Sequence, residues 1–421
     1  MRISESVSTT RFNIRFPEEV VKIAKILKNH GYKAYAVGGC VRDSVMGREP
    51  SDWDMTTDAR PEEMLDAFAQ AGLSTIPTGL KHGTVTVVID KKPFEITTFR
   101  IDGAYSDSRR PDSVTFSSDI SEDLRRRDFT VNAMAADPLF HENSEKNSPK
   151  SHENCEIVDL FGGLEDIDKK IIRCVGNPHE RFSEDALRIL RAVRWSSVLG
   201  FTVEEHTLNA AAELSCKLIE VSAERKAVEL EKTLLSDNAD EGFEHLLNIG
   251  ATRFIHEKLH KPLVALSSLP KNFSARLAAL IEGEERVSLS SMKLSNEVSH
   301  KASLLADRNF YNSCCRFYGD EMSANARYMI AKYRDGAEAA ATLRSDATLL
   351  SAIECERASG GFATEISDLA VNGNLLMAEG IEQRSLGHIL SSLLLAVIKE
   401  PHLNQTDTLI ALAKELFAEG K

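Results

Sequence analysis

The stretch Ala36-Val-Gly-Gly-Cys-Val-Arg-Asp-Ser-Val-Met-Gly-Arg-Glu-Pro-Ser-Asp-Trp-Asp-Met-Thr-Thr57 decides the fold of the first part of the chain. Apolar residues 33–37 predict a strand, the glycines at 38 and 39 predict a tight turn, and the run up to Gly47 predicts a short helix. Residues 51–57 then fit a second strand. Because side chains at i and i+2 of a strand share a face, we expect Asp52 and Asp54 to project together.

This unit indicates a site for a triphosphate and a divalent cation. Two neighbouring carboxylates supply oxygen ligands, which hard cations prefer. The turn at Gly38 and Gly39 has no Cβ atoms to keep a ligand away, and backbone N–H groups that open a helix attract phosphate oxygens. A lone Gly-Gly or Asp-x-Asp is usually only a turn or a solvated strand end. Their combination, with Arg42-Asp43 after the glycines, favours the functional interpretation.

Length and composition describe a globular protein of several domains. The chain has 421 residues, of which 42% are hydrophobic and 27% charged, and this suggests two to four domains. It has no signal-peptide pattern, and no apolar run approaches the ~20 residues that span a bilayer. We therefore expect a cytoplasmic protein with no membrane partner. The seven cysteines form no Cys-x-x-Cys pair and are expected to be reduced thiols.

The distribution of charge allows an RNA partner despite a net charge of −13. Phosphate binding needs clustered Lys and Arg, so the acidic average argues against nucleic acid. Between Lys169 and Arg194, however, seven basic residues stand against three acidic ones. This segment predicts a basic stripe on an acidic protein. The sequence gives no indication of the oligomeric state.

Regular elements surround the first unit. Residues 18–29 and 60–70 have the periodicity of amphipathic helices. Residues 83–90 and 92–100 alternate like the strands of an antiparallel hairpin, which we expect beside the strand that carries the two aspartates. Glu95 in this hairpin is a candidate third catalytic carboxylate. A surface strand residue is an equally good interpretation.

Two polar segments contain no clear period. Residues 102–116 are rich in turn formers and predict a mobile loop next to the site. Residues 141–154 contain no apolar side chain and predict an exposed, disordered insertion. Between them lies Asp123-Leu-Arg-Arg-Arg-Asp-Phe-Thr-Val-Asn-Ala-Met134. Arg127 could hold a phosphate there, and Asp128 could accept a hydrogen bond from a ribose hydroxyl.

A second chemical element lies at residues 181–195, where we expect Ser183 to cap a helix. The charged residues that recur there every third position, and so form one polar stripe, are Asp185, Arg188, Arg191 and Arg194. A solvated helix face with weak salt bridges is the plain alternative. Cytosine and adenine, however, present an amino donor beside a ring-nitrogen acceptor, whereas uracil and guanine present a carbonyl beside an N–H. A carboxylate that accepts and a guanidinium that donates would select C and A without a template.

Together these motifs resemble class II tRNA nucleotidyltransferases, the CCA-adding enzymes. These belong to the tRNA nucleotidyltransferase and poly(A) polymerase family of the DNA polymerase β-like nucleotidyltransferase superfamily. The shared motifs, in the family's order between about Phe16 and Lys232, are Gly-Gly-x-Val-Arg-Asp with Asp-x-Asp, Arg-Arg-Asp-Phe-Thr-x-Asn-Ala, Asp-x-x-Gly-Gly-x-x-Asp and Glu-Asp-x-x-Arg-x-x-Arg-Ala-x-Arg. The resemblance covers the first half of the chain, and the motifs are specific in combination.

The resemblance implies roles for the matching residues. Asp52 and Asp54 would be the catalytic Mg²⁺ ligands, joined by the catalytic candidate Glu95. The implied nucleotide-binding residues, spread over all three segments, are Gly38, Gly39, Arg42, Arg127, Asp128, Asp185, Arg188, Arg191 and Arg194. Among them, Asp185 and Arg188 would read the base.

The resemblance also implies an α+β fold. A polymerase β-like nucleotidyltransferase head, with a mixed sheet and helices, would precede an all-helical neck, body and tail. The expected bounds are 1–165 for the head, 166–236 for the neck, 237–340 for the body and 341–421 for the tail, which would bind tRNA. Amphipathic helical patterns after Phe201 agree with this division.

The implied reaction is template-independent addition of C, C and A to tRNA 3′ ends from CTP and ATP, with release of pyrophosphate. One Mg²⁺ would activate the RNA 3′-hydroxyl and a second would bridge the triphosphate, so no histidine base is needed. An A-adding tRNA enzyme would share every motif. A poly(A) polymerase of this family usually carries a basic Gly-Arg-Arg-Phe-like stretch where this chain has Thr78-Gly-Leu-Lys-His-Gly-Thr84, which favours tRNA. A non-enzymatic RNA-binding module would be expected to lack a metal carboxylate.

Overall fold

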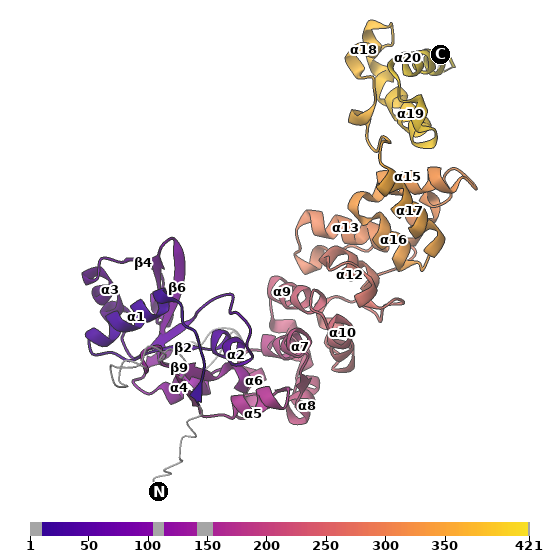
Figure 1. The fold of residues 1–421 in the computed structure, drawn as a ribbon. Coiled ribbons are helices and arrows are strands. Elements are labelled where there is room, and N and C mark those ends of the chain that lie inside the picture. The colour runs from indigo at the N-terminus through magenta and orange to yellow at the C-terminus, as the bar shows by residue number, and fades with distance from the viewer. Residues whose placement is uncertain (1–10, 104–112, 141–154, 420–421) are drawn as a thin grey trace. The chain divides into compact units, whose positions relative to one another are not determined.

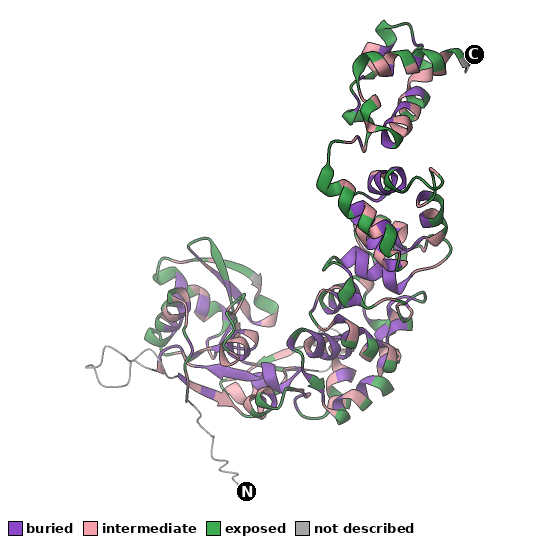
Figure 2. Ribbon diagram, turned by 45° about the vertical axis from the view of Figure 1, so that its right-hand side comes forward, coloured by how far each residue is buried: buried purple, intermediate pink, exposed green. Residues whose placement is uncertain are grey.

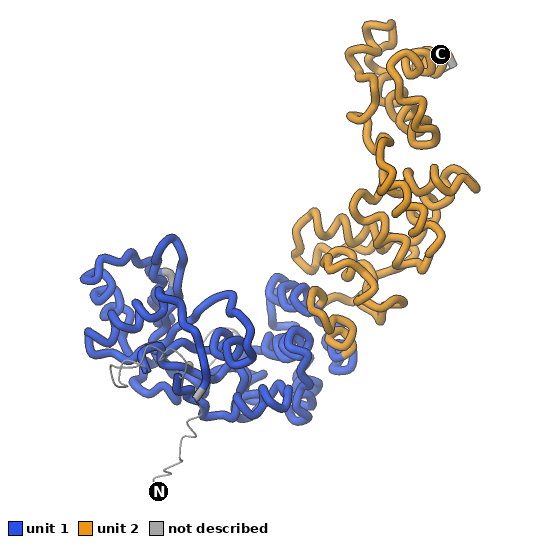
Figure 3. The backbone as a smooth tube through the Cα atoms, in the orientation of Figure 1, with its two compact units in different colours: residues 1–233, 245–254 blue, residues 234–244, 255–421 orange. Residues whose placement is uncertain are grey.

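The computed structural model describes residues 11–103, 113–140 and 155–419. The chain separates into two compact units, residues 1–233 with 245–254 and residues 234–244 with 255–421 (Figure 3). The division into head, neck, body and tail is finer than this separation, and its bounds stay a prediction. None of the described helices has the length and apolar character needed to span a lipid bilayer.

The centre of the head is an eight-stranded mixed sheet (Figure 1). Its strands in chain order are β1 (Arg11–Phe12), β2 (Ala34–Val37), β3 (Met55–Thr57), β4 (Ser74–Gly79), β5 (Thr84–Ile89), β6 (Lys92–Thr98), β9 (Met134–Ala136) and β10 (Cys155–Asp159). Their spatial order is β1-β10-β9-β2-β3-β6-β5-β4. Only β3 and β6 pair in parallel, and the other neighbours are antiparallel. This confirms the mixed sheet and the predicted hairpin beside β3.

Helices cover the sheet and supply its apolar core. Those of the head are α1 (Glu18–Asn29), α2 (Gly39–Val45), α3 (Pro61–Gln70), α4 (Ile120–Arg125) and α5 (Gly163–Asp168). In α1, Val20, Ile23 and Leu27 are fully buried, and in α3 Phe68 is fully buried, all in one cluster with the inward residues of β5 and β6. Figure 2 shows this buried layer along the strands. The helices predicted at residues 18–29 and 60–70 are therefore confirmed.

The strand predicted at residues 51–57 begins only at Met55. Its antiparallel partner β2 ends at Val37, where Gly38 turns the chain away from the sheet. The last backbone hydrogen bond joins the N–H of Val37 to the carbonyl of Asp54 at 3.0 Å. Residues 51–54 thus have no partner strand, and the two aspartates lie in the loop that enters β3.

Two polar segments fall largely outside the described residues. A separate two-stranded sheet pairs β7 (Arg100–Asp102) with β8 (Val114–Phe116), so both ends of the predicted loop at 102–116 are joined by an antiparallel ladder. Residues 104–112 between these strands lie outside the described part of the chain, as does the predicted insertion at 141–154.

Helices dominate the rest of the first unit. After α5 they are α6 (Pro178–Glu184), α7 (Leu187–Leu199), α8 (Glu205–Glu213), α9 (Ala223–Leu234), α10 (Ala239–Asn248) and α11 (Thr252–Ile255), of which the last three each contain residues of both units. The predicted all-helical neck also holds a short parallel sheet of β11 (Ile171–Ile172) and β12 (Thr202–Val203). Two-residue strands are too short to produce an alternating pattern, so the sequence did not reveal them.

The single helix predicted at residues 181–195 is two helices. Ser183 lies inside α6 and caps nothing, which corrects the predicted N-cap. Asp185 has an extended backbone, with φ −142° and ψ 102°, and its carboxylate accepts a hydrogen bond from the Leu187 N–H at 3.0 Å. Since an Asp side chain that binds a nearby N–H competes with helical bonding, the chain breaks at this residue. Asp185 therefore precedes α7, and the stripe on that helix consists of arginines alone.

The second unit contains no strand among its described residues. Its further helices are α12 (Phe273–Leu280), α13 (Asn296–Ala306), α14 (Arg308–Cys314), α15 (Met322–Tyr333), α16 (Ala337–Leu343), α17 (Ala347–Ser359), α18 (Gly373–Ala378), α19 (Leu386–Lys399) and α20 (Thr406–Glu419). The buried Arg327 of α15 donates to the carbonyls of Ile398 and Lys399 at 2.6 and 2.7 Å, and so satisfies the C-terminal end of α19. The helical prediction for this half is confirmed. All seven cysteines of the chain are free thiols.

Candidate functional site

The glycine turn after β2 leaves no space for a side chain. Gly38 has φ 84° and ψ −130°, a conformation that L-residues rarely adopt. A Cβ atom at Gly38 would lie 3.0 Å from Nη1 of Arg127. The helix α2 begins at Gly39, directly after the turn. The predicted strand, turn and short helix are confirmed, and the guanidinium of Arg127 lies against the turn.

Asp52 and Asp54 form an open pair of carboxylates. Both residues are exposed, and no described Lys or Arg makes a salt bridge with either. Desolvation by neighbouring protein atoms, followed by the charge of Asp52, raises the pKa of Asp54 to about 6, and Arg127 acts in the opposite direction. A bound cation would remove this repulsion between like charges.

The donor set at this pair fits Mg²⁺. Mg²⁺ is commonly held by one or two carboxylates together with substrate phosphates, and Asp52 and Asp54 offer only oxygen ligands. Within the described part of the chain, no three His, Cys, Asp or Glu residues are arranged to hold a metal ion. The remaining ligands would therefore come from the substrate and water.

Glu95 lies in the strand next to the aspartates. Parallel pairing of Met55 with Ile96 aligns Glu95 with Asp54 across neighbouring chain segments. Glu95 is exposed, and its charge adds a small upward contribution to the pKa of Asp54. Its alignment is compatible with a third carboxylate, but it does not complete a metal-binding group, so its catalytic role stays a prediction.

Arg127 is held by a buried carboxylate that the sequence analysis did not single out. Nη2 of Arg127 is 3.3 Å from Oδ2 of Asp123 in α4. Asp123 is fully buried, and its Oδ1 also accepts from Nε and Nη2 of Arg126 at 3.0 and 2.7 Å. Burial alone would raise the pKa of Asp123, but Arg126 and Arg127 outweigh it, and the pKa is lowered.

Arg42 is engaged inside the protein. The residue is only 3% exposed, and its Nη1 donates to Oδ1 of Asn132 at 2.6 Å. It also pairs with its neighbour Asp43 at 2.8 Å, and its Cζ lies 4.1 Å from the ring centre of Trp195 in α7. Asn132 belongs to the quoted Arg-Arg-Asp-Phe-Thr-x-Asn-Ala motif, so its role was discoverable from the sequence. Direct contact of Arg42 with a triphosphate stays a prediction.

Asp128 joins the head to helix α7. Its Oδ2 accepts from Nε of Arg191 at 2.6 Å, and Nη2 of the same arginine lies 2.5 Å away. Burial would raise the pKa of Asp128, but the charges of Arg191 and Arg188 outweigh it and lower the pKa. The two residues that the sequence placed near the nucleotide are thus brought together, in this structure as partners of each other.

The remaining charged residues of this region are also paired. Oδ2 of Asp185 accepts from Arg225 in α9 at 2.7 Å. Arg188 donates to Glu184 at 2.6 Å and to the carbonyls of Arg181 and Arg126, each at 3.1 Å. The side chains of Asp185 and Arg188 therefore have different partners, although the backbone N–H of Arg188 donates to the Asp185 carbonyl at 3.0 Å.

The last arginine of the stripe is the most deeply placed. Nε of Arg194 lies 2.9 Å from Oε2 of Glu229 in α9, and both side chains are almost fully buried. Burial lowers the pKa of Arg194 to about 10, although Glu229 acts in the opposite direction. Glu229 and Arg225 were not predicted as partners of the arginine stripe and Asp185. Their i,i+4 spacing on α9 was the available signal.

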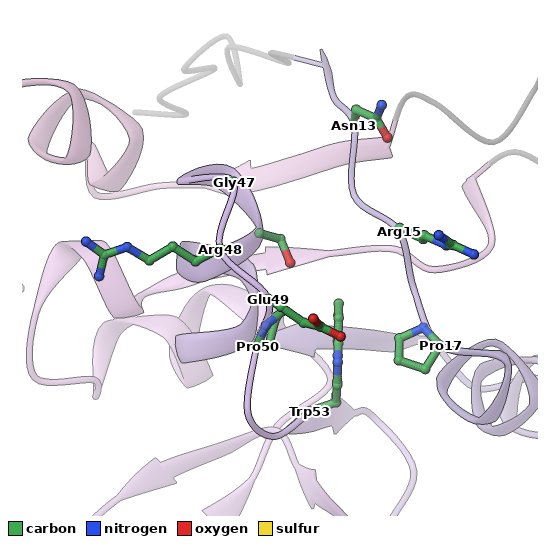
Figure 4. A pocket seen from close by; sticks show the side chains of 9 residues that line it. Asn13, Arg15, Pro17, Gly47, Arg48, Glu49, Pro50 and Trp53 are labelled. Atoms are coloured by element: carbon green, nitrogen blue, oxygen red, sulfur yellow. The ribbon is translucent and has the colours of Figure 1, made fainter.

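A cavity of about 380 Å³ lies beside the site and contains none of its predicted residues (Figure 4). Its lining includes Arg15, Pro17, Glu49 and Trp53. Trp53 stands between the two aspartates in sequence, and its ring packs against Phe16 with the ring centres 5.5 Å apart. We assign no substrate to this cavity.

Two family descriptions match the chain. The poly A polymerase head domain matches residues 34–173, and the probable RNA and SrmB-binding site of polymerase A matches residues 200–262. A CCA-adding enzyme of Lactiplantibacillus plantarum is 34% identical, over 95% of this chain and 96% of the relative. The chain belongs to the CCA-adding enzyme family. These enzymes are nucleotidyltransferases, and the sequence-based assignment is confirmed.

Further CCA-adding enzymes agree along almost the whole chain. That of Enterococcus faecalis is 32% identical, over 96% of this chain and 97% of its own length. The crystal structure of the Bacillus stearothermophilus CCA-adding enzyme in complex with CTP matches with a TM-score of 0.75 and 31% identity, over 94% of this chain and 96% of that chain. The α+β fold with a mostly helical second part is thereby confirmed.

Proposed function

We propose that this protein adds C, C and A to the 3′ ends of tRNA, using CTP and ATP and releasing pyrophosphate. The observation that carries the proposal is the 34% identity to a CCA-adding enzyme along 95% of the chain. The open carboxylate pair of Asp52 and Asp54 supports catalysis over mere RNA binding. The CTP complex of the relative from Bacillus stearothermophilus supports a cytidine nucleotide as substrate. The free cysteines support a reducing compartment, and we place the reaction in the cytoplasm.

Asp52 and Asp54 would hold two Mg²⁺ ions at the reacting phosphate. The chemistry that bound Mg²⁺ supplies is charge neutralisation on the triphosphate and easier loss of the proton from the attacking 3′-hydroxyl. Arg127, which lies against the Gly38 turn, would donate to phosphate oxygens. The absence of a side chain at Gly38 keeps that approach open.

Base selection would come from Asp185 and Arg188. A carboxylate has about four acceptor positions, and the bonds from Leu187 N–H and Arg225 use two of those on Asp185. Asp185 can therefore accept from the amino group of C or A without first losing its partners. Arg188 would donate to the adjacent ring nitrogen, for which one of its bonds to Glu184 or to a backbone carbonyl must be exchanged.

The test uses three tRNA transcripts with purified protein and Mg²⁺. One transcript ends before the first C, one after the first C and one after the second C. Each is incubated with CTP alone, with ATP alone and with both, and products are resolved at single-nucleotide length. We expect CTP to extend the first two transcripts up to the second C, and ATP to extend only the third. Asp54→Ala is the inactive control.

Each rival function predicts another pattern of products. An A-adding tRNA enzyme extends only the third transcript and ignores CTP. A poly(A) polymerase uses ATP on all three transcripts and adds long tails. An RNA-binding module binds the transcripts without extending them. The A-adding enzyme is the strongest rival, because it would share every motif quoted above.

A further inference from the structure

Asp123 connects strand β3 to the arginines of the Arg-Arg-Asp segment. Its carboxylate is fully buried in α4. Oδ1 accepts two N–H groups of Arg126, while Oδ2 lies 3.3 Å from Nη2 of Arg127 and 3.4 Å from Oγ1 of Thr56. Thr56 is in β3, two residues after Asp54. A buried carboxylate is tolerated because these partners compensate its charge.

The guanidinium of Arg127 has a defined position against the Gly38 turn. It lies against the Gly38 turn, where its Nη1 is 3.0 Å from the position of a Cβ atom, and its charge acts on Asp54. Its Nε is buried without a hydrogen-bond partner. Among the described residues, Asp123 alone makes a hydrogen bond or an ion pair with this side chain. The arginine side chain is 20% exposed, so it remains accessible from the site.

We propose that Asp123 is a positioning residue of the nucleotide site, which fixes the Arg127 guanidinium against the Gly38 turn and relative to β3 so that it meets the triphosphate. The inference rests on the proposed function, because it requires a nucleoside triphosphate at this turn. A long arginine side chain loses rotamer freedom when it binds a phosphate. Asp123 reduces that loss by holding the guanidinium in place before the nucleotide arrives.

The competing explanation is that Asp123 only compensates the charge of Arg126 and stabilises α4. Under that explanation, loss of the carboxylate lowers thermal stability and leaves the affinity of the folded protein for nucleotide unchanged. Equilibrium binding of CTP with Mg²⁺ and without RNA separates the two, because no turnover occurs. Titration calorimetry gives the Kd of the folded protein directly.

The test compares Asp123→Asn with Asp119→Asn. Asp119 belongs to the same segment, but its carboxylate is exposed and accepts from the Ser121 N–H as the N-cap of α4. We expect Asp123→Asn to raise the Kd for CTP and the KM for CTP about ten- to a hundredfold, the usual range for a hydrogen bond to a charged group. The Kd for tRNA should change by less than about threefold. Asp119→Asn keeps an oxygen that can accept from the Ser121 N–H, so it should leave the unfolding temperature nearly unchanged and both constants for CTP unchanged.

A double-mutant cycle links the effect to Arg127. In the background of Arg127→Gln, Asp123→Asn should raise the Kd for CTP by less than about twofold further, because the guanidinium that it positions is already gone. In the background of Arg126→Gln, the full effect of Asp123→Asn should persist. Equal effects of Asp123→Asn in both backgrounds would show that Asp123 does not act through Arg127 and would overturn the proposal.

A folded Asp123→Asn protein with wild-type Kd for CTP would also overturn it. If that variant does not fold, Asp123→Glu replaces it: the longer side chain keeps the charge but displaces the carboxylate, so the proposal still expects a raised Kd, and an unchanged one refutes it. Failure of this inference is distinct from failure of the proposed function. A wild-type protein that extends tRNA while Asp123→Asn binds CTP normally refutes only the inference, whereas a wild-type protein that neither binds CTP nor extends tRNA refutes both.

Discussion

The carboxylates before β3 were expected to bind Mg²⁺ and the charged side chains around α7 to bind the nucleotide, and the surroundings of the two groups are opposite. Asp52 and Asp54 are exposed and have no salt bridge with a described residue. Around α7, Asp185 pairs with Arg225, Arg188 with Glu184, and Arg191 with Asp128. The carboxylates before β3 thus have no ion-pair partner among the described residues, whereas the charges around α7 are neutralised within the protein.

The difference agrees with the ligand proposed for each region. A divalent cation needs carboxylate oxygens that no arginine occupies, and the repulsion between the two aspartates adds to its binding. A nucleobase is neutral and offers only hydrogen bonds, so a buried, unpaired charge waiting for it would be costly. Internal partners would keep the side chains near α7 ordered and charged until a base arrives. Under the proposed function the cation site would be open in advance, whereas base binding would involve sharing or exchange of partners.

The largest expected effect comes from substitutions in the open carboxylate pair before β3. Asp52→Ala or Asp54→Ala should lower kcat for both CTP and ATP by more than about a thousandfold, since charge stabilisation at the reacting group is commonly the largest single contribution to catalysis. The unfolding temperature and the Kd for tRNA should stay near the wild-type values. Product formation from transcripts ending before each of the three positions measures the loss. Near-normal turnover in Mg²⁺ would refute the assignment of this pair.

Glu95→Gln is the matched comparison for that experiment. Glu95 is an exposed carboxylate in the neighbouring strand, aligned with Asp54. A fall in kcat of more than about tenfold would add it to the catalytic set, because removal of single catalytic groups typically costs at least this much. Unchanged kcat would leave a site of two carboxylates and identify Glu95 as a surface strand residue.

The second prediction concerns the ion pair between Asp128 and Arg191 near α7. Asp128→Asn leaves Arg191, whose side chain is 33% exposed, without its partner. It should destabilise the protein by about 2 kcal/mol at pH 7, the range for a hydrogen bond to a charged group and less than for a fully buried pair. The folded-state pKa of Asp128 is below its ordinary value of 3.8, so the pair contributes stability above that value and loses it as the pH falls through the folded pKa. The difference in unfolding free energy between wild type and variant should therefore be constant from pH 7 to 5 and shrink below about pH 4. A difference that stays constant down to pH 2 would contradict this coupling.

The sequence predicted the parts of the site that depend on local pattern. The strand, glycine turn and helix at residues 34–45 follow from apolar runs and from glycine at a left-handed position. Asp52 and Asp54 were predicted as metal ligands from their spacing together with the preceding Gly-Gly unit, and that role stays a prediction. The bounds of β3 were wrong, because they depend on where the partner strand β2 ends. The helix predicted at residues 181–195 was wrong in beginning before Asp185, because Asp185 binds the Leu187 N–H and separates α6 from α7.

Pairing between distant segments was beyond the sequence pattern. Asp128 meets Arg191 across 63 positions, and Asp185 meets Arg225 across 40. A period of three along one segment shows which residues share a face, but it does not show which residues from other elements face them. The contact between Trp195 and Arg42 was also not predicted. The guanidinium of Arg42 lies over the Trp195 ring, although Arg42 belongs to a segment far upstream of Trp195.

The third prediction tests base selection by the paired region. Asp185→Ala removes the acceptor for the amino group of C or A without touching the metal carboxylates. A good bidentate base contact discriminates by about 1–3 kcal/mol, so the ratio of kcat/KM for CTP to that for UTP should fall about tenfold while total activity also drops. Glu165→Ala, which breaks the exposed pair with Lys169, should leave the ratio unchanged. An unmoved ratio in an active Asp185→Ala protein would mean that Asp185 does not read the base.

The smallest expected effect comes from Arg225 and tests whether this arginine orients the Asp185 carboxylate or competes with the base for it. Arg225 donates to Oδ2 of Asp185, while the Leu187 N–H holds Oδ1. Arg225→Gln removes one of these two anchors, so we expect the ratio of kcat/KM for CTP over UTP to fall only about threefold, less than the loss of a full base contact. Lys232→Gln, an exposed substitution on the same helix α9, is the control and should change nothing.

The direction of the change in CTP usage decides the outcome. If Arg225 orients the carboxylate, kcat/KM for CTP falls in Arg225→Gln together with the ratio, because Asp185 then samples more rotamers before the base arrives. If Arg225 instead occupies the acceptor position that the base needs, its removal raises kcat/KM for CTP. A rise would refute the shared-partner arrangement inferred from the structure and would show that the ion pair must break before each nucleotide is bound.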